Sequence, residues 1–171
     1  MKTESHAKIK SLALGALLVS LALIFSYVEV LLPISMGIPG IKLGLANIVV
    51  LIALCRMSTG GAFCISVLRI LISALLFGNA YSLLYSAAGG VLSFIIMTLL
   101  MRCGLFSVVG VSMAGGAAHN AGQLIAAGIV LGSAKVAYYF PVLLISGMVT
   151  GIVNGFIAAA VLRNIKNGAL R

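Results

Sequence analysis

Long, nearly uncharged apolar segments constrain this chain more than any other feature. The first, SLALGALLVSLALIFSYVEVLL (residues 11–32), contains one charged residue, Glu29. An α-helix needs about 20 predominantly apolar residues to cross a bilayer. Only 8% of the 171 residues are charged, whereas a soluble domain carries about 25%. The chain is therefore predicted to be an integral membrane protein.

Turn-forming residues divide the chain into six predicted helices. Short breaks rich in Gly, Pro, Ser and Asn separate them, and no linker or low-complexity block divides the chain. We expect one domain, 1–171, folded as an all-α bundle of six transmembrane helices. The predicted helices are 9–32, 39–55, 59–77, 81–101, 106–131 and 140–162. The first is expected to be retained, because about 22 apolar residues exceed a signal-peptide core and no cleavage site follows.

The basic residues predict the orientation of the bundle. Cytoplasmic loops of membrane proteins accumulate Lys and Arg, which accounts for the net charge of +9 without nucleic-acid binding. With the N-terminus inside, Lys42 and Lys135 fall outside and Arg69 lies within a helix. Both termini are therefore predicted to be cytoplasmic. The basic residues on that side would be Lys2, Lys8, Lys10, Arg56, Arg102, Arg163, Lys166 and Arg171.

The sequence lacks the residue patterns that several kinds of catalysis require. It has no phosphate-binding GxxxxGK[ST] motif. Its two acidic residues, Glu4 and Glu29, cannot form the carboxylate cluster that holds Mg²⁺. A Ser-His-acid triad based on His119 would lack its acid. We expect no catalytic residue, metal or cofactor, and no enzyme acting alone.

Polar residues inside the predicted helices are candidates for function, because burying them in a membrane is expensive. Arg69 lies ten residues into its helix, at a depth of about 15 Å. Each candidate also has a structural explanation: Arg69 could bridge backbone carbonyls, polar residues of 106–131 could join helices, and Glu29 could pair with Lys42. The candidate substrate-binding residues are Glu29, Lys42, Asn47, Arg69, Asn79, His119, Asn120 and Gln123.

The segment GIPGIKLGLANIVVL (37–51) suggests an anion site. Pro39 suits the first turn of a helix, where its missing N–H would be unpaired. Lys42 would lie in that same turn, where a cation is unfavourable unless an anion is bound there. Residues 33–43 are therefore predicted to form part of an outer pocket for an anionic group.

Small residues spaced four apart predict close helix packing. Gly147, Gly151 and Gly155 favour packing within the chain. On the first helix, Gly15, Ala16 and Ser20 could equally pack within the chain or dock a second protein.

Three motifs resemble one known family: PGIKLGLANIVVL, SAAGGVLSFIIM and GGAAHNAGQLIAAGIV. They look like the Gx transporter family, also labelled heptaprenyl diphosphate synthase component I. That family is similar to the substrate-binding S components of energy-coupling factor (ECF) transporters. The resemblance spans Glu29 to Gly132 and implies a multi-pass protein of the bacterial cytoplasmic membrane.

The resemblance also implies partners and a function. An S component captures a vitamin-like molecule at its outer face and docks on a transmembrane scaffold subunit that works with two cytoplasmic ATPases. In such proteins small residues of the first helix contact the scaffold. Ala16 and Ser20 have that spacing here, although Ala-xxx-Ala is absent. The leading hypothesis is capture of a small anionic vitamin-like, cofactor-precursor or isoprenoid-precursor molecule. The alternatives are an accessory membrane subunit of an isoprenoid or quinone biosynthetic enzyme, and an oligomeric channel.

Overall fold

The computed structural model describes residues 2–31, 42 and 44–168. The described residues form six α-helices and one short 3₁₀ helix, with no strand among them. The all-α prediction is therefore confirmed for this part of the chain. The elements are α1 (Lys2–Leu31), α2 (Asn47–Arg56), α3 (Thr59–Phe77), α4 (Ala80–Cys103), α5 (Val108–Leu131), η1 (Ala134–Tyr139) and α6 (Phe140–Gly168).

Four stretches of these helices are long and apolar enough to cross a membrane: Ile9–Leu31, Thr59–Phe77, Ala80–Cys103 and Ala134–Ile165. The chain is thus a multi-pass membrane protein. Helix α5 has 24 residues, as many as α4. It contains a His, an Asn and a Gln that lower its mean hydropathy, and all three are buried inside the bundle.

Helix α2 differs from its prediction. The sequence predicted a helix over 39–55, but α2 begins at Asn47 and has ten residues. Gly44 has a positive φ of 82°, and Lys42 is not helical, so the helix cannot extend back through them. Ten residues span about 15 Å, half of a hydrocarbon core of about 30 Å. The placement of Pro39 lies outside the described residues.

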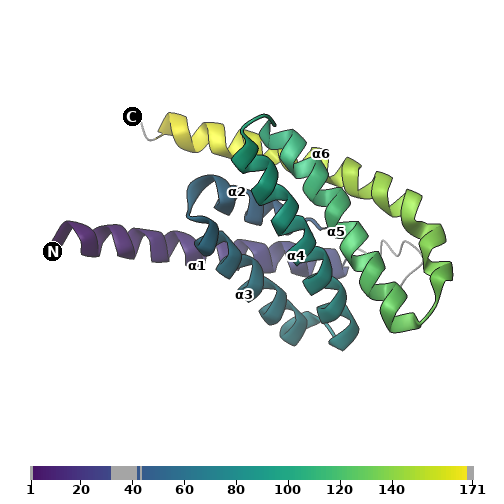
Figure 1. Ribbon diagram of the computed structural model, residues 1–171. Helices are drawn as coiled ribbons and strands as arrows, with labels where there is room; N and C mark the ends of the chain where they lie inside the picture. Colours follow the sequence, from purple (N-terminus) through teal and green to yellow (C-terminus); the bar gives the residue numbers. More distant parts are fainter. Residues whose placement is uncertain (1, 32–41, 43, 169–171) are drawn as a thin grey trace.

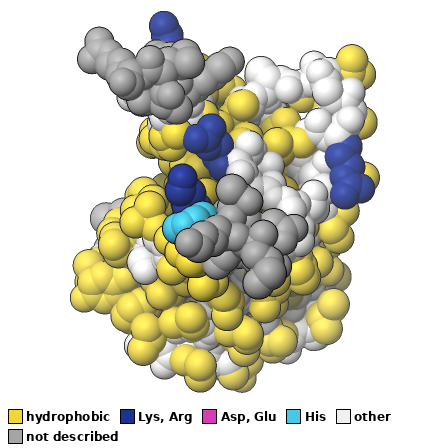
Figure 2. All heavy atoms as spheres, turned by 90° about the vertical axis from the view of Figure 1, so that its left-hand side faces the viewer, with side chains coloured by type: hydrophobic (Ala, Val, Ile, Leu, Met, Phe, Trp, Pro, Cys, Tyr) yellow, Lys and Arg dark blue, Asp and Glu magenta, His cyan; other side chains and the backbone are white. Residues whose placement is uncertain are grey.

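The beginning of α1 and the end of α6 lie at the same end of the bundle (Figure 1). That end exposes Lys10, Arg56, Arg102 and Arg163. Figure 2 views it and shows Lys and Arg side chains gathered there. Helix η1 connects α5 to α6 at the opposite end of the bundle in Figure 1. Its residue Lys135 is exposed. The exposed basic side chains that the structure describes are therefore distributed asymmetrically between the two ends of the bundle.

Glycines bring α5 and α6 into backbone contact. A Cβ added at Gly147 would lie 2.5 Å from the carbonyl oxygen of Gly116, and one at Gly151 would lie 2.5 Å from that of Ser112. At Gly155 it would lie 2.7 Å from Cα of Val109. The prediction that these three glycines pack within the chain is confirmed.

Helix α2 occupies the centre of the bundle. It contacts each of the other five α-helices, and its residues Asn47 to Ala53 are all buried. Helix α1 faces this core through Leu18, Ala22 and Ser26, which share one face at four-residue spacing. The N-terminus of α2 is consequently held inside the protein.

Candidate functional site

The site lies where the chain enters α2, and side chains from three helices hold it there. Glu29 Oε1 on α1 accepts a hydrogen bond from the Leu45 N–H at 2.7 Å. Asn154 on α6 donates its amide to the Gly44 carbonyl at 3.2 Å. The first turn closes with the Asn47 N–H donating to the Gly44 carbonyl at 3.0 Å. These contacts fix a half-length helix with its positive N-terminal end inside the bundle.

Gln123 on α5 binds the backbone of Lys42 in two places. Its Oε1 accepts from the Lys42 N–H at 3.0 Å, and its Nε2 donates to the Lys42 carbonyl at 3.2 Å. The same Nε2 lies 2.6 Å from Nε2 of His119. An amide nitrogen can only donate, so this imidazole nitrogen accepts, and His119 is neutral with its proton on Nδ1.

Arg69 supplies a buried cation beside the same turn. Its side chain is only 3% exposed, and its Nη2 donates to Asn47 Oδ1 at 3.4 Å. Asn47 in turn donates to Ser93 Oγ on α4 at 3.4 Å. Both distances are at the long end of the hydrogen-bonding range. Asn47 therefore links the guanidinium on α3 to α4 through weak bonds.

Within the described residues, two charged groups of this site have buried polar atoms without a partner. They are Nε of Arg69 and Oε2 of Glu29. Within the described part of the chain, Glu29 forms no ion pair with Arg69 or Lys42, although the three charges lie near enough to influence one another. The alternative in which Glu29 pairs with Lys42 is thus not found, and Oε1 of the carboxylate accepts from the Leu45 N–H.

Lys42 takes part in the site mainly through its backbone. It lies before α2 and not in the first helical turn, so the predicted placement is wrong. Its half-buried side chain is the second cation near the turn. The pKa of the Lys42 side chain is lowered, mainly because burial disfavours its charged form. The Glu29 carboxylate opposes this shift, and Arg69 adds to it.

Two predicted residues lie elsewhere. Asn120 donates to the Leu143 carbonyl at 2.7 Å and to Ser146 Oγ at 3.1 Å, so it joins α5 to α6. Asn79 is exposed and caps α4, accepting from the Ser82 N–H at 2.8 Å. Both have the structural roles that polar residues commonly play at helix contacts and helix ends.

Sequence reasoning missed two residues of the site, Ser93 and Asn154. Both are buried, with exposures of 0% and 5%. Each is a polar residue within an apolar helical segment, which is the signal that identified the others. Asn154 was not identified because the glycines of its helix were interpreted as a packing surface, and the polar residue among them was not considered.

An apolar groove of about 680 Å³ runs along the outside of α1 and α3. The small residues Gly15, Ala16 and Ser20 line it on α1, and Gly61 and Cys64 line it on α3. The hydroxyl of Ser20 donates to the Ala16 carbonyl at 3.0 Å, which satisfies it without a partner protein. Ala16 and Ser20 are exposed, so they point away from the core.

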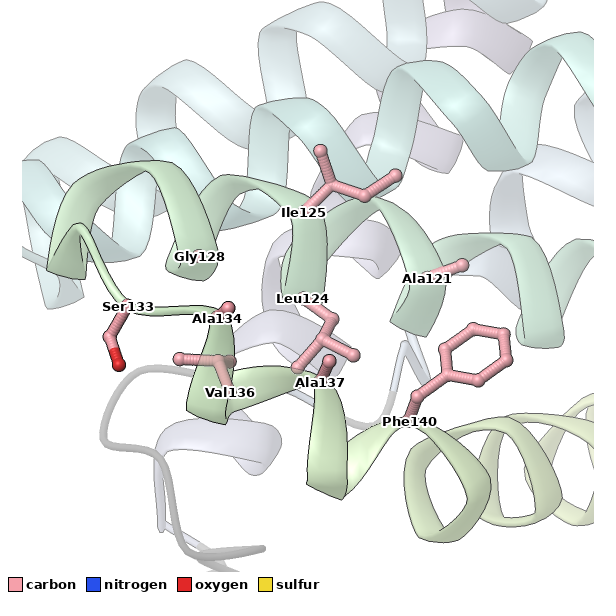
Figure 3. A pocket seen from close by; sticks show the side chains of 9 residues that line it. All are labelled: Ala121, Leu124, Ile125, Gly128, Ser133, Ala134, Val136, Ala137 and Phe140. Carbon is pink, nitrogen blue, oxygen red and sulfur yellow. The ribbon is translucent and has the colours of Figure 1, made fainter.

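A smaller hollow of about 270 Å³ lies between α5, η1 and the start of α6. Figure 3 shows its lining, which includes Leu124 and Ile125 from α5 and Phe140 from α6. The lining contains none of the predicted substrate-binding residues, so this hollow is separate from the site.

Comparison with known proteins places the chain in a family. A family model described as "Heptaprenyl diphosphate synthase component I" matches residues 18–161, which is most of the chain. No curated protein and no solved structure matches. The matched region includes α2–α5 and every side chain that holds the entry into α2. The chain therefore belongs to the heptaprenyl diphosphate synthase component I family.

Proposed function

We propose that this protein is the substrate-binding S component of an ECF-type importer in the bacterial cytoplasmic membrane. It captures a small vitamin-like, cofactor-precursor or isoprenoid-precursor molecule with an anionic group at its outer face. A transmembrane scaffold subunit and two cytoplasmic ATPases complete the importer. The protein itself is not an enzyme.

The observation that carries this proposal is the buried charge next to the start of α2. Transporters commonly bind anionic groups at the N-terminal ends of short, discontinuous helices near the middle of the membrane. Here α2 is short and begins inside the bundle, and Arg69 lies beside its first turn with one N–H that has no partner among the described residues. A buried cation with spare hydrogen-bonding capacity suits the recognition of a carboxylate or phosphate.

The groove on α1 and α3 supports docking on a scaffold. Grooves lined by small residues let two membrane helices approach closely. Gly15, Ala16 and Ser20 line this groove. Ala16 and Ser20 are exposed on the side of α1 away from the core residues Leu18 and Ala22, whereas Gly15 is half-buried. A partner helix could therefore bind without disturbing the bundle.

The orientation of the bundle agrees with capture from outside. The end that exposes Lys10, Arg56, Arg102 and Arg163 is taken to be cytoplasmic by the positive-inside rule. The turn into α2 then lies at the outer end of α2, because Arg56 is at the other end of that helix.

The alternative function is an accessory membrane subunit of an isoprenoid or quinone biosynthetic enzyme. The description of the family, heptaprenyl diphosphate synthase component I, favours it. Such a subunit would need a separate catalytic partner, because this chain has only two acidic residues to hold the Mg²⁺ of diphosphate chemistry.

One purification distinguishes the two functions. The full chain, gently solubilised from its native membrane, is analysed by native mass spectrometry and its co-purifying proteins are identified. The importer predicts one bound small molecule per chain, together with a membrane scaffold and ATPases. Co-purification of a soluble, Asp-rich synthase, with neither a bound small molecule nor ATPases, would refute the importer and support the alternative.

A further inference from the structure

Among the residues that the structure describes, the turn into α2 leaves a donor and an acceptor unpaired. Arg69 uses Nη2 on Asn47 but has no partner for Nε. Glu29 uses Oε1 on the Leu45 N–H but has none for Oε2. The residues that they contact, Asn47 and Leu45, are two positions apart, so the backbones of those two residues are separated by at most about 7 Å. Both side chains thus end near the start of α2, where one small molecule could contact them.

Opposite charges that are buried near each other in a protein would normally come into contact. In a medium of low polarity, an ion pair gains the most when its atoms meet and its remaining hydrogen bonds are satisfied. Here the two groups come from different helices, are each held by a different residue of the turn, and do not meet. Polar atoms buried without a partner are rare in folded proteins, and a missing ligand is one reason for them.

The signs of the two groups restrict what can bind. A purely anionic molecule suits Arg69 and the half-buried Lys42 side chain, but it leaves the Oε2 acceptor of Glu29 unpaired and brings a second negative charge toward that carboxylate. A purely cationic molecule has the reverse defect. A molecule with an acceptor at one position and a donor at another satisfies both buried atoms without placing like charges together.

From these contacts we infer that the cargo is amphoteric: an anionic group binds Arg69, and an amine, hydroxyl or ring N–H donates to Oε2 of Glu29. This inference rests on the proposed binding function and narrows its substrate class. It separates the cargo from simple prenyl phosphates and carboxylates, which lack the donor. Nε2 of His119 is occupied by Gln123, whereas its Nδ1 is a further buried donor without a partner among the described residues.

The test uses the native full chain in lipid nanodiscs and a bacterial small-molecule extract in three forms. One form is untreated, one is acetylated to block amines and hydroxyls, and one is methyl-esterified to block carboxylates and phosphates. Retained compounds are identified by mass spectrometry. A cargo whose donor is an amine or hydroxyl is retained from the untreated extract and lost after either treatment, whereas one whose donor is a ring N–H is lost only after esterification. Retention that survives acetylation of a compound with no other donor overturns the inference and leaves the binding function standing. No retention from any extract overturns both.

Two variants test whether the cargo contacts Glu29 and Arg69. Glu29→Gln keeps an oxygen for the Leu45 N–H but replaces the other acceptor with a donor, so retention should fall about 30-fold or more. Arg69→Lys keeps the positive charge but removes the guanidinium, both Nε and the Nη2 that binds Asn47, and should also weaken retention. Lys135→Gln, an exposed cation on η1, is the matched control and should bind normally. Normal retention by a folded Glu29→Gln protein would overturn the inference. If that variant does not fold, the comparison of the three extracts with the native protein decides whether the cargo is amphoteric.

Discussion

Adding one methyl group at Gly151 should separate α5 from α6. A Cβ built there would lie 2.5 Å from the carbonyl oxygen of Ser112 and 2.8 Å from Cα of Met113. Optimal contacts between heavy atoms are about 3.5–4.0 Å long. Both neighbours belong to the backbone of a packed helix, so no side chain can rotate away. The helices themselves must move apart by about 1 Å.

The cost follows from overpacking. Inserting a methyl group into a well-packed core costs about 1–3 kcal/mol. Gly128→Ala is a matched control, because Gly128 is also inside a helix and has no atom within 4 Å of its added Cβ. The effect of replacing Gly by Ala on helix propensity is common to both variants. The difference of about 1–3 kcal/mol between them therefore reports the close contact alone.

The assay is thermal unfolding of both purified variants in the same detergent. For a chain of this length, 1 kcal/mol corresponds to a change of about 2–4 °C in Tm. Gly151→Ala should therefore unfold about 2–12 °C below Gly128→Ala. Equal transition temperatures would show that the α5–α6 contact is looser than described, and the reasoning about backbone contact would fail.

Two further predictions concern the membrane orientation and the groove. A cysteine at Asn79 should react with an impermeant reagent added outside intact cells, while one at Ser58 should not; the reverse pattern would invert the topology. Ala16→Leu should impair uptake while the isolated protein still retains its cargo, because the larger side chain fills the groove and leaves the site untouched. Ala13→Leu, exposed on α1 outside the groove lining, is the control, and equal uptake by the two variants would rule out the groove as the docking surface.

Most helices could be predicted from local sequence. The helix predicted over 59–77 coincides with α3, and the boundaries predicted for α4 and α5 differ from the structure by one or two residues. Membrane helices satisfy their backbone hydrogen bonds internally, so an apolar run bounded by turn residues nearly defines them. Helix α6 extends beyond its predicted end at 162 to Gly168, because no strong breaker follows Leu162 directly.

Helix α2 could not be predicted in the same way. Its sequence continues an apolar pattern from 39 onward, yet the helix begins only at Asn47. What stops it is contact with distant residues: Gln123 binds the backbone at Lys42, and Asn154 binds it at Gly44. These partners lie 81 and 110 positions away in sequence. Local propensity cannot contain that information.

The sequence by itself determined that the chain is a membrane protein, where most of its helices lie, and which polar residues are costly enough to need a role. Only the tertiary structure decided which of them meet. Asn120 and Gln123 are three positions apart on α5, yet one binds α6 and the other holds the entry into α2. The hydrophobic effect and backbone hydrogen bonding act on composition and local pattern, so they can be read from sequence. Pairing between polar side chains depends on the rotation and depth of each helix, which packing alone fixes.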